Sequence, residues 1–140
     1  MPIDAREQER RRTLIAEHYA AENDHDLDRI MDTFADDAVM HYNHQPFEGD
    51  EGIRGVHTLI GMSASPGSFS GLRAVIDAEH YTDEETVVEG RMRGKHSNEF
   101  LGFAPTERDV ELPFVAFYRF DNNGKLSSER IVMNLAPLQP

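Results

Sequence analysis

The sequence of 140 residues predicts a single α+β domain, because helical hydrophobic spacing occupies its first part and strand alternation its second. Leu14, Ile15, His18 and Tyr19 fall on one face of a helix. Residues 86–96 instead alternate between apolar or small side chains and charged ones, which is the period of a strand. Helices followed by antiparallel strands are typical of the α+β class.

Three helices are predicted, and each follows an aspartate that can cap it. Asp4 precedes a helix that runs through Ala20, and Asp26 precedes a second whose apolar stripe ends at Phe34. Asp50 precedes the third helix. Loops are expected at residues 45–49 and at residues 63–71, which are rich in Ser, Gly and Pro.

Five strands are predicted from β-prone composition and alternation. The segment 110–120 is apolar on both faces, which indicates a central strand covered on both sides. Residues 121–124, Asp-Asn-Asn-Gly, form a hairpin turn before the last strand. The expected strands are 38–42, 72–81, 86–96, 110–120 and 125–134.

Composition excludes several classes of function. Acidic residues number 26 against 14 basic ones, so the surface repels phosphate backbones and anionic membranes, and no nucleic-acid or membrane partner is expected. The absence of cysteine excludes disulfides, thiolate metal sites and a cysteine nucleophile. No long apolar run and no secretory signal is found, and a cytoplasmic protein is therefore expected.

Two stretches carry a resemblance to a known family. Residues 94–108, GKHSNEFLGFAPTER, resemble the GTHTGEFMGIPPTGR signature of SnoaL-like polyketide cyclases, and residues 117–120 with 124–126 resemble that family's last hairpin. Residues 34–39, FADDAV, are similar to the wider nuclear transport factor 2-like superfamily. The resemblance implies a cone in which three N-terminal helices pack on a curved antiparallel sheet. It also implies a pocket at one end and a homodimer formed through the outer face of the sheet.

The family's activities include ring closure, isomerisation, dehydration and epoxide hydrolysis, and other members only bind, so the pocket residues must decide the function. In the cyclases a His-Trp-Asp triplet on the last strand carries the acid/base aspartate. The matching positions here are Glu129, Arg130 and Ile131, so isoleucine replaces the aspartate. The three catalytic positions of the related ketosteroid isomerases fall at Tyr42, His18 and near Ala116, where their roles are lost.

His96 is the first candidate for acid/base chemistry. It ends the inward side of the predicted strand 86–96, and imidazole titrates near neutral pH. The alternative is a histidine that only binds backbone at the end of a strand.

Glu129 is the second candidate, because a strand places it on the same face as Ile131 and Met133, where desolvation raises a carboxyl pKa. The alternative is a surface carboxylate paired with Arg119 or Arg130. A register slip of one residue would turn Asn134 inward instead.

Tyr42 and His44 occupy alternate positions and are expected to face the pocket mouth together, with Tyr42 polarising a substrate carbonyl. The predicted pocket lining is Tyr19, Met92, Phe114, Tyr118, Ile131, Met133 and Asn134, with His44.

No metal and no cofactor are predicted. The sequence has no phosphate-binding glycine loop and no nucleophile-elbow serine. Histidines 18, 41, 44 and 96 show no His-x-x-x-His spacing, and His-Asn-Tyr-His at 41–44 is not a metal motif.

Two functions stay open. One is a cofactor-independent acid/base enzyme (cyclisation, isomerisation or dehydration) acting on a small or polycyclic apolar compound with carbonyl or hydroxyl groups. The other is a non-catalytic binding or interaction domain using the same pocket.

Overall fold

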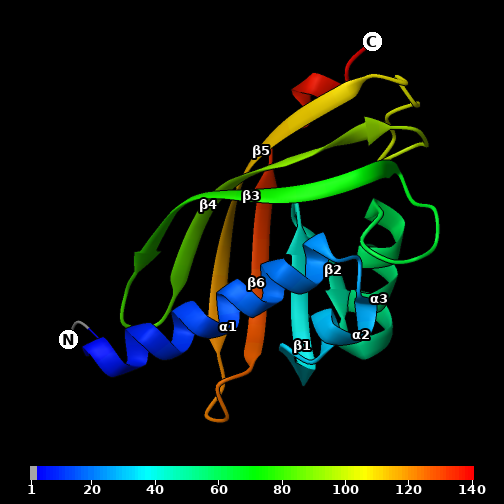
Figure 1. Ribbon diagram of the computed structural model, residues 1–140. Helices are drawn as coiled ribbons and strands as arrows, with labels where there is room; N and C mark the ends of the chain where they lie inside the picture. The colour runs from blue at the N-terminus through cyan, green and yellow to red at the C-terminus, as the bar shows by residue number, and fades with distance from the viewer. Residues whose placement is uncertain (1–2) are drawn as a thin grey trace.

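The computed structural model describes residues 3–140, and it confirms the order of helices followed by strands (Figure 1). The helices are α1 (Ala5–Asn23), α2 (Leu27–Met31), α3 (Gly49–Ile60) and a short 3-10 turn, η1 (Ala136–Leu138). The strands are β1 (Phe34–Tyr42), β2 (Gln45–Glu48), β3 (Phe69–Tyr81), β4 (Thr86–His96), β5 (Asp109–Phe120) and β6 (Leu126–Met133).

The strands form one curved sheet of six, in the order β2-β1-β6-β5-β4-β3. Neighbouring strands are antiparallel except for β1 and β6, which run parallel. Helix α1 crosses the concave side of the sheet, and α2 and α3 lie beside β1 and β2 (Figure 1). This arrangement is the predicted cone of three N-terminal helices on a curved sheet, in which one strand pair departs from the antiparallel pattern.

Helices α1 and α2 begin at an aspartate whose side chain caps them, whereas α3 does not. The side chains of Asp4 and Asp26 accept hydrogen bonds from the backbone N–H groups of Glu7 and Arg29, as predicted. The prediction that the second helix extends to Phe34 is wrong, because the helix ends at Met31 and Phe34 begins β1.

The prediction that Asp50 caps the third helix is also wrong. Helix α3 begins at Gly49, its N-cap residue is Glu48, and no side chain makes the capping hydrogen bond. Asp50 lies in the first helical turn instead, where a negative charge is favoured by the helix dipole, and it accepts a hydrogen bond from Arg54.

Residues 45–48 form an edge strand rather than the predicted loop. Asn43 and His44 have φ of 46° and 72°, which are the positive values that a two-residue hairpin turn requires. The turn pairs β2 with β1, and Pro46 is tolerated because β2 is an edge strand.

Strand β3 begins at Phe69, inside the segment predicted to be a loop. Its first residues pair with the end of β4, and the register then shifts between Ser70 and Arg73. Gly71, with φ of 61°, lies at this irregularity and lets the strand continue past it.

Strand β5 is central, as predicted, but the chain covers only one of its faces. Leu112, Phe114, Ala116 and Tyr118 are buried, whereas the alternate residues of this strand are half-buried or exposed. The inner face joins α1, α3 and the other strands in one hydrophobic core. Within residues 3–140 no helix is long and apolar enough to cross a membrane.

Candidate active site

A cavity lies where the inner face of the sheet meets α1 and α3. Its volume is about 10 Å³, which is room for one water molecule. Three polar side chains reach it, from Glu22, His57 and Glu129. The rest of its wall is apolar apart from one hydroxyl, and consists of Met40, Tyr42, Val56, Ile60, Met62, Met92 and Ile131.

Glu129 faces this cavity because of its position in β6. The structure places it on the inner face with Ile131 and Met133, and its side chain is buried. The alternative of a surface pair is therefore wrong. Arg119 and Arg130 point the other way, and both contact Glu85.

One oxygen of the Glu129 carboxylate is open. The Tyr118 hydroxyl donates to Oε2 at 3.4 Å, whereas Oε1 has no hydrogen-bond partner in the described part of the chain. Burial raises the pKa of Glu129; attraction to His18 opposes this rise and repulsion from Glu22 adds to it. A carboxyl group with a raised pKa and a free oxygen suits general acid/base chemistry.

Two tyrosine hydroxyls extend from Glu129 into the core. The hydroxyls of Tyr19 and Tyr118 lie 2.5 Å apart, and both side chains are buried. Burial and the nearby Glu129 charge raise the pKa of each well above its ordinary value, so both remain protonated. The pair therefore supplies a chain of hydroxyls that ends on the carboxylate.

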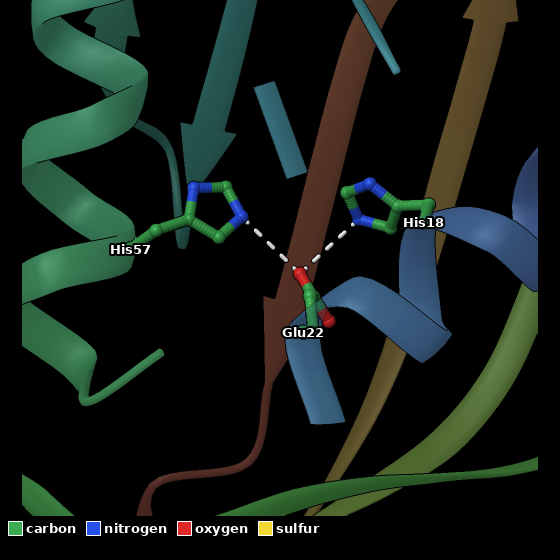
Figure 2. A group of neighbouring side chains, drawn as sticks. All are labelled: His18, Glu22 and His57. Atoms are coloured by element: carbon green, nitrogen blue, oxygen red, sulfur yellow. Dashed lines mark hydrogen bonds and ion pairs between the residues drawn. The ribbon is translucent and has the colours of Figure 1, made fainter. Parts of the chain in front are cut away.

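At the wall of the cavity, three buried side chains converge from two helices (Figure 2). His18 and Glu22 lie one turn apart on α1, and His57 reaches across from α3. Oε2 of Glu22 lies 3.1 Å from Nε2 of His18 and 3.2 Å from Nε2 of His57. Nε2 of His18 is also 3.7 Å from Oε1 of Glu129.

Hydrogen bonds on the far side of each ring fix its tautomer. Nδ1 of His57 lies 2.8 Å from the carbonyl oxygen of Ile53, which can only accept, so this nitrogen carries a proton. Nδ1 of His18 lies 2.9 Å from the Thr33 hydroxyl, which already donates its hydrogen to the Ile30 carbonyl. Both rings are therefore protonated on Nδ1, and both turn Nε2 toward Glu22.

The charges in this cluster stabilise one another. Burial tends to raise the pKa of Glu22, but His18 and His57 outweigh it and lower that pKa to about 2. Burial tends to lower the pKa of His18, but Glu22 and then Glu129 outweigh it, so the pKa is raised. In the absence of another cation, Glu22 is ionised and His18 is its counter-ion.

The structure brings several predicted residues to the cavity. Tyr42, Met92 and Ile131 line it together with Glu129. The Tyr42 hydroxyl donates to Sδ of Met133 at 3.5 Å, a weak acceptor that a substrate oxygen can replace. Phe114 stacks on Tyr19 in the neighbouring core, with ring centroids 6.4 Å apart.

Two predicted lining residues are exposed. His44 does not face the same way as Tyr42, because the hairpin turn at 43–44 ends the strand before it. Asn134 follows the end of β6 and its side chain accepts from the backbone N–H of Ala136. Neither residue lines the cavity.

His96 is buried, but it is not among the residues that line the cavity. Nδ1 accepts from the backbone N–H of Thr106 at 3.2 Å, and the ring stacks on Phe69 with centroids 5.2 Å apart. Nε2 has no partner within residues 3–140. These contacts hold the loop after β4, and a catalytic role for His96 stays a prediction.

Sequence reasoning missed Glu22 and His57. Glu22 follows His18 by four residues on a face that also carries Ile15 and Tyr19, and His57 shares a face of α3 with the buried Ile53. Polar residues at helical spacing within apolar stripes were the available signal. Their convergence depends on how α3 packs against α1, which no local pattern encodes.

The site thus combines a cone of helices on a curved sheet with acidic and imidazole groups beside a small apolar cavity. The SnoaL-like domain family matches residues 15–129, and the chain belongs to this family. A comparison with curated proteins finds no match.

Solved structures show the same fold. A protein assigned as a SnoaL-like polyketide cyclase from Jannaschia sp. CCS1 is 22% identical with a TM-score of 0.75, over 100% of this chain and 96% of that one. SalBIII, an epoxide hydrolase/cyclase-like enzyme with a role in pyran ring formation in polyether salinomycin, is 16% identical with a TM-score of 0.75, over 93% and 95%. A protein with a ketosteroid isomerase-like fold from Catenulispora acidiphila is 12% identical with a TM-score of 0.73, over 89% and 88%. At these identities the likeness establishes the fold alone.

Proposed function

We propose that this protein is an acid/base enzyme that cyclises, isomerises or dehydrates a small apolar compound carrying carbonyl or hydroxyl groups. The observation that carries the proposal is the buried Glu129 carboxylate, which has one open oxygen beside an apolar cavity. The reaction class needs no redox or nucleotide cofactor, because it only moves protons. Membership of the SnoaL-like family supports the same chemistry.

In this mechanism Glu129 takes a proton from carbon or oxygen of the substrate and returns it elsewhere. Tyr42 donates its hydroxyl hydrogen to the substrate carbonyl, which favours the negative charge that develops there. Both residues line the same cavity. The hydroxyls of Tyr118 and Tyr19 lie behind Glu129 and can reorient as its protonation changes.

Substrate entry requires side chains to move, because the cavity volume of about 10 Å³ holds only water. Met40, Met62 and Met92 form much of the wall. Methionine is unbranched and rotates readily, so these three side chains are the ones that would yield to a ligand.

The test is product analysis after incubation with polyketide-like, terpenoid and steroidal carbonyl compounds. Glu129→Gln keeps the shape and removes the acid/base group, and we expect it to lower turnover at least about a hundredfold. His96→Ala, measured in parallel, decides whether His96 takes part. Turnover by wild type that is unchanged in Glu129→Gln would contradict the proposal.

The alternative is a non-catalytic binding domain, which the isoleucine at position 131 favours, because the cyclases carry their aspartate there. This alternative predicts ligands that raise the melting temperature of wild type and of Glu129→Gln equally, with no product from either.

We also propose a homodimer formed through the outer face of the sheet. Val115 and Phe117 are only half-buried there, and Val132 is 48% exposed. A second copy would cover these apolar side chains. Sedimentation of a monomer at micromolar concentration would contradict this proposal.

A further inference from the structure

The cluster of His18, Glu22 and His57 needs a positive charge between its imidazole nitrogens and the Glu22 carboxylate. Because each Nδ1 holds a proton, each Nε2 presents a lone pair toward Glu22 unless a second proton occupies it. A lone pair facing a carboxylate oxygen at 3.1 or 3.2 Å is repulsive. The site therefore requires either a proton on each Nε2 or one cation among the three groups.

Buried polar atoms that lack a hydrogen-bond partner are concentrated around this cluster. Six buried side-chain nitrogen or oxygen atoms have no hydrogen-bond partner within residues 3–140. Half of them belong to this cluster and its neighbour: Nε2 of His18, Oε1 of Glu22 and Oε1 of Glu129. The contact between Nε2 of His18 and Oε2 of Glu22 is close, yet this nitrogen makes no hydrogen bond within the described residues.

The spacing matches a metal coordination shell. One ligand atom from each of His18, Glu22 and His57 lies within 4.8 Å of the others. With metal–ligand bonds of about 2.0–2.1 Å, the donors of a tetrahedral zinc site lie about 3.3 Å apart. The separations of 3.1 and 3.2 Å between Glu22 Oε2 and the two Nε2 atoms are close to that value.

The hydrogen bonds on the far side of each imidazole ring also match those of metal-binding histidines. Histidines that bind a metal through one nitrogen donate the other N–H to a carbonyl or hydroxyl oxygen, which fixes the ring. His57 does this to Ile53 and His18 does it to Thr33.

Charge and ligand chemistry identify the class of ion. The Glu22 carboxylate faces both rings, and Oε1 of Glu129 lies 3.7 Å from Nε2 of His18, so acidic oxygens of two residues adjoin the position that a divalent cation would take. Two imidazoles favour zinc-like transition metals over Mg²⁺ and Ca²⁺, which prefer oxygen ligands.

We propose that His18, Glu22 and His57 bind one divalent transition-metal ion of the zinc class, with Glu129 beside the remaining coordination position. This inference goes beyond the proposed function, which requires no cation, and binding is measurable without a substrate.

The experiment is calorimetric titration of the chelator-treated, dialysed full chain with Zn²⁺, alongside Co²⁺ titration followed by visible absorption, with Mg²⁺ as the comparison ion. We expect saturable one-to-one binding of Zn²⁺ and a tetrahedral Co²⁺ spectrum, with no competition from Mg²⁺. Absence of saturable binding of both transition metals would overturn the proposal.

Variants locate the site. Glu22→Gln removes the charge, and His57→Asn keeps a donor for Ile53 while removing Nε2. We expect each to weaken Zn²⁺ binding by more than the roughly 10- to 100-fold that loss of an outer contact causes. His80→Ala is the matched control, because His80 forms an exposed pair with Glu89 at 2.6 Å, outside the cluster. Binding that survives the first two variants but is lost in His80→Ala would place the ion on the surface and refute the site.

A measurement on wild type alone guards against variants that fail to fold. Imidazole nitrogen NMR resonances should show Nδ1 of His18 and His57 still protonated after Zn²⁺ addition, with both Nε2 resonances shifted. Unshifted Nε2 resonances at saturating Zn²⁺ would exclude the cluster as the site.

Discussion

The two halves of α1 bury polar side chains in contrasting ways. Near its N-terminal end Arg11 donates to Glu7 at 3.0 Å and to the backbone oxygens of Thr82, Asp83 and Glu85 at 2.8, 2.7 and 3.3 Å. Every nitrogen of this guanidinium therefore has an acceptor. Its contacts hold the hairpin between β3 and β4 against the helix.

Two turns further along, the same helix buries His18 and Glu22 with open atoms beside a cavity. Both regions keep charged groups out of water, but only the first satisfies them. The contacts of Arg11 therefore serve the fold, whereas the open atoms of His18 and Glu22 support the proposed cation site.

The largest effect on stability is expected from Arg11→Met. This change keeps much of the side-chain volume but removes the hydrogen bonds from the guanidinium to the backbone oxygens of Thr82, Asp83 and Glu85. A hydrogen bond from a charged group contributes roughly 1.5–3 kcal/mol. We expect a loss of about 3 kcal/mol in urea denaturation. Zn²⁺ affinity of the folded protein should not change. A destabilisation no larger than that of a surface arginine variant would contradict the conclusion that Arg11 stabilises the fold.

A gain in stability, rather than a loss, is expected when Glu129 is replaced. The raised pKa of Glu129 means that its ionised form costs stability in the core at neutral pH. Replacement by leucine should therefore raise stability by on the order of 1 kcal/mol, while turnover is lost. Urea denaturation and product analysis on the same preparation test both parts. A clear loss of stability would mean that Glu129 supports the fold as Arg11 does.

The stability of the metal-free protein should decline as pH rises. The raised pKa of His18 means that its contribution is fully present below its unfolded value of 6.5 and is lost as pH rises through the folded value. The raised pKa of Glu129 acts in the same direction, because ionisation in the core costs stability above 4.5. Melting temperatures from pH 5 to about 9 in chelator measure the slope, and a flat profile would show that the cluster does not titrate with unfolding.

The smallest effect is expected at the surface. His80 and Glu89 are 58% and 53% exposed, and solvent weakens such a pair. His80→Ala should leave the melting temperature unchanged within error. A loss similar to that of Arg11→Met would show that burial does not separate the two kinds of polar group.

The sequence was sufficient for features that depend on local pattern. Asp4 and Asp26 cap their helices, and the predicted strand 86–96 coincides with β4. Strand periodicity put Glu129 on the same face as Ile131 and Met133 but left open whether that face is the inner one, and the structure places it inward.

What the sequence did not reveal depends on geometry between distant segments. The hairpin turn at Asn43 and His44 has no glycine to mark it, so β2 was missed. His57 has an ordinary helical setting, and it becomes part of a cluster only because α3 packs beside the end of α1. The separations among His18, Glu22 and Glu129 likewise needed three dimensions.

The parallel pairing of β1 with β6 dictates when these groups can meet. Residues 34–42 dock beside residues 126–131, and the antiparallel strands form the intervening connection. Closing so long a loop is entropically costly and slow compared with forming a hairpin. During synthesis on the ribosome, Glu129 therefore joins Glu22 and His57 only after residues 126–131 have emerged, so the cavity is completed late in folding.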